Sequence, residues 1–221
     1  MAKSGLLKSS IAKKVAMALS GLFLMLFLAQ HFLINMTSVI SADLFNAISH
    51  FMGTNPLVQF VIQPILIIGV IFHFIMGFVL NIQNNKARPI GYASYNGAAN
   101  ASWASRNMII SGSVILAFLA LHFYDFWFPE MVYKYIEFNP ADEARYFPEL
   151  VEKFENPIRT ALYCLSFVLL SLHLQHGFSS SFQSVGANNK YTKGMKNFGL
   201  WFSIIVPLGF VFIAVFHHFN Q

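Results

Sequence analysis

Four histidines lie deep inside four consecutive apolar stretches of this 221-residue chain: His31, His73, His122 and His173. A titratable side chain within a membrane-spanning segment is costly and usually serves a function. Each of the four lies about 15 residues into its own stretch, so their depths match. Imidazoles at matched depths on successive helices are suited to hold a metal-containing cofactor between those helices.

The composition is that of a membrane protein. Hydrophobic residues make up 56% of the chain and charged residues only 10%, with a mean hydropathy of +0.57. A soluble domain would carry about 25% charged residues. The single cysteine, Cys164, excludes a disulfide within the chain and a thiolate-held iron–sulfur cluster. The basic residues lie at the membrane edges, a placement that argues against nucleic acid as a partner.

Five apolar stretches are long enough to cross a bilayer as helices, which requires about 20 residues. Helices are favoured because backbone groups in lipid must be satisfied within the segment. We therefore predict an all-α membrane protein, a single domain over residues 1–221, with a short interfacial helix over about 40–51. No internal repeat is evident. The predicted spans are roughly 15–34, 57–80, 108–128, 157–178 and 197–219.

Basic residues alternate between the two sides of this topology. They concentrate in the N-terminal segment and in the second and fourth loops, whereas the first loop and the C-terminal tail have none. The positive-inside rule then places the N-terminus in the cytoplasm and the C-terminus outside. Eight of the nine acids lie between Asp125 and Glu155, so the third loop is expected to cap the outer face. The third loop carries Lys134, Arg145 and Lys153, diluted by these acids. The basic residues of the N-terminal segment and of the second and fourth loops are Lys3, Lys8, Lys13, Lys14, Lys86, Arg88, Arg106, Lys190, Lys193 and Lys196.

Depth sorts the four histidines into two pairs. At 1.5 Å per residue, each lies roughly 23 Å from the face at which its span enters. In a core of about 30 Å, His31 and His122 form an outer layer, and His73 and His173 form an inner layer roughly 15 Å away. Two imidazoles per layer suit a six-coordinate b-type haem. Glycines four residues from inner histidines, Gly69, Gly77 and Gly177, would let a flat macrocycle approach the backbone.

Other histidines leave alternatives open. His176 lies one turn from His173 and is a rival ligand on the fourth span. His217 and His218 end the fifth span and are expected at the level of the lipid headgroups. Isolated histidines can also be hydrogen-bonded core residues. A transporter whose histidines relay protons is a further reading, although the spans offer no mid-depth carboxylate to partner them.

Several motifs make the chain resemble the cytochrome b subunit that anchors dihaem succinate:quinone oxidoreductases of the succinate dehydrogenase/fumarate reductase family, in its single-subunit, five-helix form. The matching stretches are QHFLIN, LFNAISHFMG, FHFIMGFVL, ALHFYDFW and HLQHGF…VG. The resemblance covers most of the chain and is weakest in the third loop and the fifth span. It implies His31, His73, His122 and His173 as axial ligands and favours His173 over His176, since Gly177 and Gly186 follow in the family's spacing.

The resemblance also implies cofactors and partners. The subunit would hold two haem b groups and pass electrons between an iron–sulfur subunit and menaquinone in the bacterial cytoplasmic membrane. A flavoprotein subunit carrying FAD, together with the iron–sulfur subunit and its clusters, would dock on the cytoplasmic face. Succinate or fumarate, intermediates of the tricarboxylic acid cycle, would react on the flavoprotein. The complex could form a dimer. The alternative function is that of a dihaem anchor for a formate dehydrogenase or hydrogenase.

Candidate quinone-binding residues cluster in the sequence beyond the first span. Gln30, Asn35, Asp43 and His50 follow one another near the expected outer layer and could bind or deprotonate a quinol. Each of the four could instead have a purely structural role, in packing or hydrogen bonding. Arg106 and Arg159 are candidates to meet haem propionates.

Overall fold

Five long apolar helices dominate the structure, a computed structural model that describes residues 9–86, 106–187 and 189–220. They confirm the five predicted spans, and their ends match or extend the predicted bounds except that the second span begins one residue later than predicted. Within the described residues there is no β-strand, so the chain is an all-helical, multi-pass membrane protein. Lys3, Lys8, Arg88 and most of the second loop lie outside the described ranges. The spans are Ser10–Ile40, Val58–Lys86, Met108–Tyr135, Pro157–Ser184 and Thr192–Phe219.

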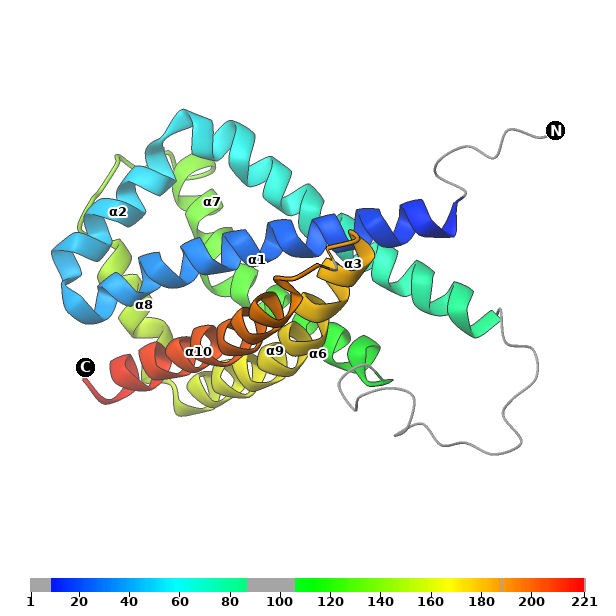
Figure 1. Cartoon of the computed structure of the whole chain (residues 1–221). Helices are drawn as coiled ribbons and strands as arrows, with labels where there is room; N and C mark the ends of the chain where they lie inside the picture. The colour runs from blue at the N-terminus through cyan, green and yellow to red at the C-terminus, as the bar shows by residue number, and fades with distance from the viewer. Residues whose placement is uncertain (1–8, 87–105, 188, 221) are drawn as a thin grey trace.

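Shorter elements complete the chain order seen in Figure 1. The short helix predicted over about 40–51 is present as α2, and two spans contain π-helical turns. Capping follows the sequence: Ser41 accepts a hydrogen bond from the Leu44 amide at the start of α2, and Asn156 caps α9 just before Pro157. The elements are α1 Ser10–Ile40, α2 Ala42–Thr54, η2 Val58–Ile62, α3 Gln63–Lys86, α6 Met108–His122, η3 Phe123–Trp127, α7 Phe128–Tyr135, α8 Tyr146–Glu155, α9 Pro157–Ser184 and α10 Thr192–Phe219.

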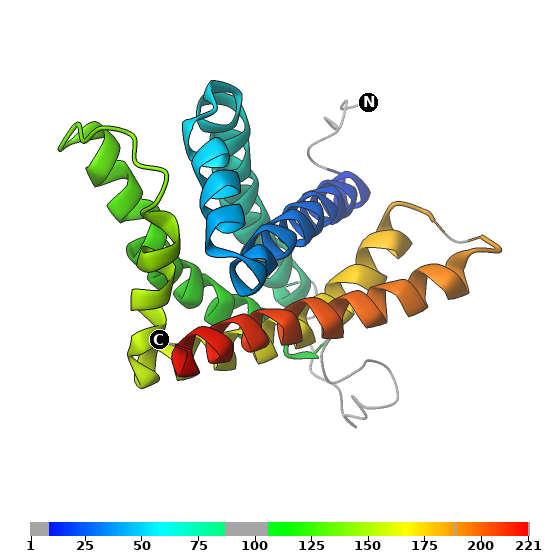
Figure 2. The ribbon, with the colours of Figure 1, turned by 90° about the vertical axis from the view of Figure 1, so that its left-hand side faces the viewer.

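The first four spans pack as a ring. α1 packs against α3 and α9, and α6 packs against the same two helices. Neither α1 with α6 nor α3 with α9 is among the closely packed pairs of the described chain, so these two pairs are diagonal across the ring. α10 lies outside the ring, along α9 and against α1, as both ribbon views show (Figures 1 and 2).

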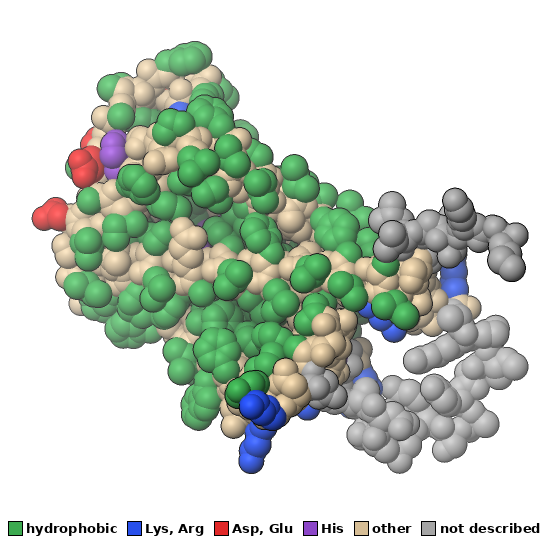
Figure 3. Space-filling model, turned by 45° about the horizontal axis from the view of Figure 1, so that its top comes forward, with side chains coloured by type: hydrophobic (Ala, Val, Ile, Leu, Met, Phe, Trp, Pro, Cys, Tyr) green, Lys and Arg blue, Asp and Glu red, His purple; other side chains and the backbone are tan. Residues whose placement is uncertain are grey.

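Charge divides between the two ends of the molecule. Acidic side chains gather at one end, near α2, α7 and α8, and most of the visible Lys and Arg side chains lie toward the other end, where α1 begins (Figure 3). Apolar side chains cover the surface between them, as expected where a helical bundle meets lipid. The third loop thus forms a cap at the acidic end, opposite the start of α1.

Two glycines set the position of α10. A Cβ built on Gly199 would come within 3.0 Å of the Phe178 ring on α9, and one on Gly209 would meet the Phe32 ring on α1 even more closely. Small residues let membrane helices approach at such contacts. Gly194, by contrast, has nothing within 4 Å of its built Cβ.

We predict that Gly199→Ala and Gly209→Ala each destabilise the protein by about 1–3 kcal/mol, because overpacking displaces an aromatic ring. The measurement is thermal unfolding of the purified protein in detergent. Gly194→Ala, on the same helix, is the matched control and should leave the transition temperature unchanged or slightly raised. Equal effects of all three variants would contradict this account of the α10 contacts.

Candidate functional site

The four span histidines come together as two pairs. The rings of His31 and His122 lie 5.8 Å apart between centroids, with an interplanar angle of 82°. The rings of His73 and His173 lie 6.3 Å apart at 70°. These are the two pairs expected from depth and topology. His173, and not His176, faces His73.

Each pair joins diagonally opposite helices of the ring. His31 on α1 faces His122 on α6, and His73 on α3 faces His173 on α9. Because these helices do not pack closely on each other, the imidazoles reach toward one another across the middle of the bundle. Both layers therefore lie inside the ring of α1, α3, α6 and α9.

The spacing between the layers follows from continuous helix. Ser20 on α1 contacts His73, and His31 lies on the same helix about 11 residues further on. At 1.5 Å per residue, the two layers are separated by about 16 Å along the helix axis. The separation along α6, from Ser111 beside His173 to His122, is the same.

Serine hydroxyls hold the inner pair. The Ser20 Oγ lies 3.0 Å from the Nδ1 of His73, and the Ser111 Oγ lies 3.3 Å from the Nδ1 of His173. Each serine comes from the neighbouring helix of the ring, so each contact also ties two spans together. Sequence inspection missed these serines, because a serine in an apolar run usually bonds only its own backbone.

Glycines and methionines surround the inner pair. The bare backbones of Gly21 and Gly112, next to the two serines, lie against the His73 and His173 rings. Gly77 and Gly177 face methionine tips, from Met17 in the first case and from Met25 and Met108 in the second. Methionine is unbranched and adaptable, so this space can be rearranged around a flat group. Gly69 differs from expectation, because the Phe23 ring packs directly on it.

Aromatic rings enclose the outer pair. Phe27 stacks on His31 and Phe118 stacks on His122, with centroids 5.4 and 5.9 Å apart. Phe210 of α10 also contacts His31. The buried Nδ1 of His122 has no hydrogen-bond partner among the described residues, which is unusual for a buried polar atom.

A buried carboxylate lies one turn beyond His122. Asp125 is 2% exposed and accepts a 2.8 Å hydrogen bond from the Tyr163 hydroxyl. Arg159 on α9 approaches its other oxygen at 3.3 Å. The Tyr163 ring in turn lies 6.4 Å from the His122 ring. Arg159, a candidate for a haem propionate, is therefore already paired with Asp125.

The two halves of the ring repeat one pattern. The sequence S-G-x5-F-L-A-x-H-F occurs over residues 20–32 and again over 111–123. The following span in each half carries H-x3-G-F, over residues 73–78 and 173–178. The expectation of no internal repeat is therefore wrong. Each half supplies one histidine to each layer, and each serine contacts the inner histidine of its own half.

The four candidate quinone residues do not gather at one point. Asn35 donates to the His31 carbonyl at 2.8 Å, and Gln30 is exposed beside Met52. Asp43 is exposed at the start of α2, whereas His50 lies against the Tyr146 ring, 6.2 Å between centroids. Of the four, Asn35 is the residue with a hydrogen bond to a histidine of the outer pair.

Arg145 organises the cap beyond the outer layer. It pairs with Glu130 and Glu149, and it lies over the rings of Tyr133 and Tyr146. Burial alone would lower the pKa of Arg145, but its hydrogen bonds to the two carboxylates outweigh burial and raise it. A permanent positive charge thus neutralises part of the acidic cap. Burial also raises the pKa of Tyr146.

The histidines at the end of α10 are more buried than expected. His217 is 1% exposed, and its Nε2 lies 2.8 Å from the Ser38 Oγ on α1. His218 contacts the Phe154 carbonyl through Nδ1 at 2.7 Å. Both contacts tie α10 to its neighbours, so these histidines help to pack the end of the fifth span, where the sequence places them.

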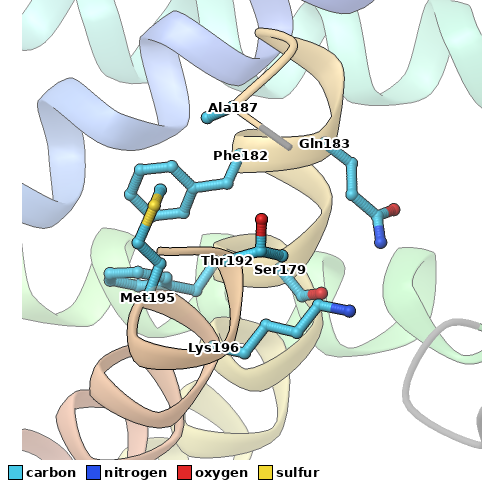
Figure 4. A pocket seen from close by; sticks show the side chains of 8 residues that line it. Ser179, Phe182, Gln183, Ala187, Thr192, Met195 and Lys196 are labelled. Atoms are coloured by element: carbon cyan, nitrogen blue, oxygen red, sulfur yellow. The ribbon is translucent and has the colours of Figure 1, made fainter. Parts of the chain in front are cut away.

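A small pocket lies at the basic end, away from the histidines. It has a volume of about 170 Å³ and opens where α9 ends and α10 begins (Figure 4). The Phe182 ring and the Met195 side chain lie side by side in it, with Lys196 at its edge. Small-molecule sites are typically about 300–1,000 Å³, so this pocket does not suggest a cofactor site.

The residues of the two layers fit a haem. Metal–nitrogen bonds to histidine are about 2.0–2.1 Å, so one metal between two opposed imidazoles places the ring centroids about 6 Å apart. The observed 5.8 and 6.3 Å agree with this spacing. A porphyrin would bring its own four nitrogens, so the two histidines of each layer would be the residues that hold it.

No protein-family model and no curated protein matches the sequence, and no solved structure matches the fold. The case for a function therefore rests on the residues and geometry described above.

We predict that Tyr163→Phe lowers the free energy of unfolding by about 1.5–3 kcal/mol, since it removes a buried hydrogen bond to a charged carboxylate. Tyr124→Phe is the control, because Tyr124 precedes Asp125 in the span Met108–Tyr135 but is 67% exposed. Thermal unfolding in detergent measures both. Indistinguishable transition temperatures for the two variants would contradict the role assigned to Tyr163.

Proposed function

We propose that this chain is a dihaem cytochrome b that anchors a succinate dehydrogenase/fumarate reductase complex in the bacterial cytoplasmic membrane. One observation carries the proposal: two pairs of opposed imidazoles lie at two depths inside one ring of spans. The sequence motifs around the same four histidines support the choice of the succinate dehydrogenase/fumarate reductase family. The active site for succinate or fumarate belongs to the partner flavoprotein.

Each histidine has one role in this proposal. His73 and His173 hold the inner haem b, and His31 and His122 hold the outer one. A haem bound in this way supplies reversible one-electron chemistry at its iron. The imidazoles fix its position and orientation, the aromatic rings around the outer pair exclude water, and the ring of spans keeps both layers out of lipid.

The arrangement defines a route for electrons across the membrane. The layers are about 16 Å apart in a core of about 30 Å, so an electron passing between them crosses roughly half of the core. Moving one charge through the whole potential is worth about 2.3 kcal/mol per 100 mV. Transfer between the layers is therefore coupled to the membrane potential, by about half that amount.

The partners would bind at the basic end. With the N-terminus in the cytoplasm, the start of α1 and the ends of α3 and α9 face the cytoplasm, where the iron–sulfur subunit would dock near the inner haem. Menaquinone would react at the membrane, and of its four candidate residues Asn35 is the best placed, beside His31. Positive-inside bias explains most of the lysines at this end without a role in docking.

The decisive variants change one histidine at a time. We predict two haems per chain in the wild type and one in His31→Ala or His122→Ala, which lose the outer haem. His73→Ala or His173→Ala should lose the inner haem. The measurement is the haem-to-protein ratio from the reduced b-type absorption, with redox titration to show which haem is left.

His176→Ala is the matched control, since His176 lies one turn from His173 and does not face His73. It should keep both haems. A folded wild-type protein without haem would overturn the proposal. If the subunits of another enzyme, such as formate dehydrogenase or hydrogenase, copurified with the chain, the haem assignment would stand. The assignment to a succinate dehydrogenase/fumarate reductase complex would then be wrong.

A further inference from the structure

We infer that Ser20 and Ser111 are positioning residues for the inner haem, each fixing the tautomer of the histidine that faces it. The inference rests on the proposed function, because it assigns a task only if His73 and His173 hold iron. The inference adds to the proposed function that the hydroxyl groups of two serines determine which imidazole nitrogen of each inner histidine is free to coordinate. Neither serine lies in a motif that the family resemblance assigned.

Counting hydrogens gives the tautomer. The Ser20 Oγ lies 2.8 Å from the Met17 carbonyl on its own helix, and donates its single proton there. Its contact with His73, at 3.0 Å, must then be a hydrogen bond that the oxygen accepts from Nδ1–H. With its proton on Nδ1, His73 has its lone pair on Nε2, the nitrogen left for iron.

The second serine repeats the arrangement. The Ser111 Oγ donates to the Met108 carbonyl at 3.0 Å and accepts from the Nδ1–H of His173 at 3.3 Å. Ser20 and Ser111 occupy equivalent places in the two S-G-x5-F-L-A-x-H-F stretches. The same device therefore occurs independently in both halves, once for each inner histidine.

The outer pair lacks this device. The His122 Nδ1 has no partner among the described residues, and His31 has only the Asn35 amide of its own helix, at 3.4 Å. A hydrogen bond from the second nitrogen fixes a ligating imidazole and raises its basicity. A more basic ligand favours the ferric iron, so the serines are expected to lower the midpoint potential of the inner haem alone.

A purely structural role has its own example in this chain. The Ser38 Oγ donates to the Asn35 carbonyl at 2.6 Å and contacts the Nε2 of His217 at 2.8 Å, which ties α1 to α10. His217 faces no second imidazole. Ser38 therefore offers a serine–histidine contact of the same construction with no task toward a haem.

The test measures the midpoint potential and the release rate of the inner haem in the purified full-length protein, in Ser20→Ala and Ser111→Ala. Both variants should raise that potential and release the inner haem about 10-fold faster or more. The outer haem should not change. Ser20→Thr and Ser111→Thr keep the hydroxyl and should restore wild-type values, whereas the equally large Ser20→Val and Ser111→Val should not.

Two controls separate the outcomes. Ser113→Ala removes a hydroxyl that bonds only the Ile109 carbonyl on α6, and Ser38→Ala removes the structural contact; neither should alter either haem. Unchanged inner haem in the Ala and Val variants, or an equal shift in Ser38→Ala, would overturn the inference while the proposed function stands. A wild-type protein without haem would refute the proposed function instead.

Discussion

The structure depends on imidazoles meeting in the middle of the bundle from helices that do not pack directly on each other. His31 with His122 and His73 with His173 span both diagonals of the ring formed by α1, α3, α6 and α9. Since each half of the ring supplies one histidine to each layer, neither layer exists unless the halves are docked. Under the proposed function, a haem could therefore be held only once the two halves of the ring are docked.

That constraint explains the residues around the pairs. Helices in lipid gain little from burying apolar surface against each other, so packing and interhelical hydrogen bonds must hold them together. The serines at the inner layer, the stacked phenylalanines at the outer layer and the glycine contacts of α10 supply these interactions. The ion pair of the buried Asp125 with the half-buried Arg159 adds a polar link between α9 and the span that carries His122.

The sequence predicted the spans and the pairing because both depend on one-dimensional quantities. Apolar length gives the helices, the placement of lysines and arginines gives their direction, and the rise per residue converts position into depth. Contacts that depend on helix rotation were not predictable in this way. In the sequence, nothing distinguishes Ser20 and Ser111 from other serines in apolar segments. In the structure, they contact His73 and His173.

Other differences have the same cause. The position of His217 at the end of a span predicts only its depth, whereas the packing of α10 on α1 buries it against Ser38. Gln30, Asn35, Asp43 and His50 are close in sequence, but the turn from α1 into α2 gives them different neighbours. The repeat is short: seven of thirteen residues are identical between 20–32 and 111–123, and the copies are separated by a different span.

The most direct test of the central claim is a redox titration of the purified wild-type protein, followed by the b-type haem absorption and referred to protein concentration. Two haems per chain that titrate as two one-electron transitions would support a dihaem bundle. A folded protein with no haem, or with a single haem and a single transition, would contradict it.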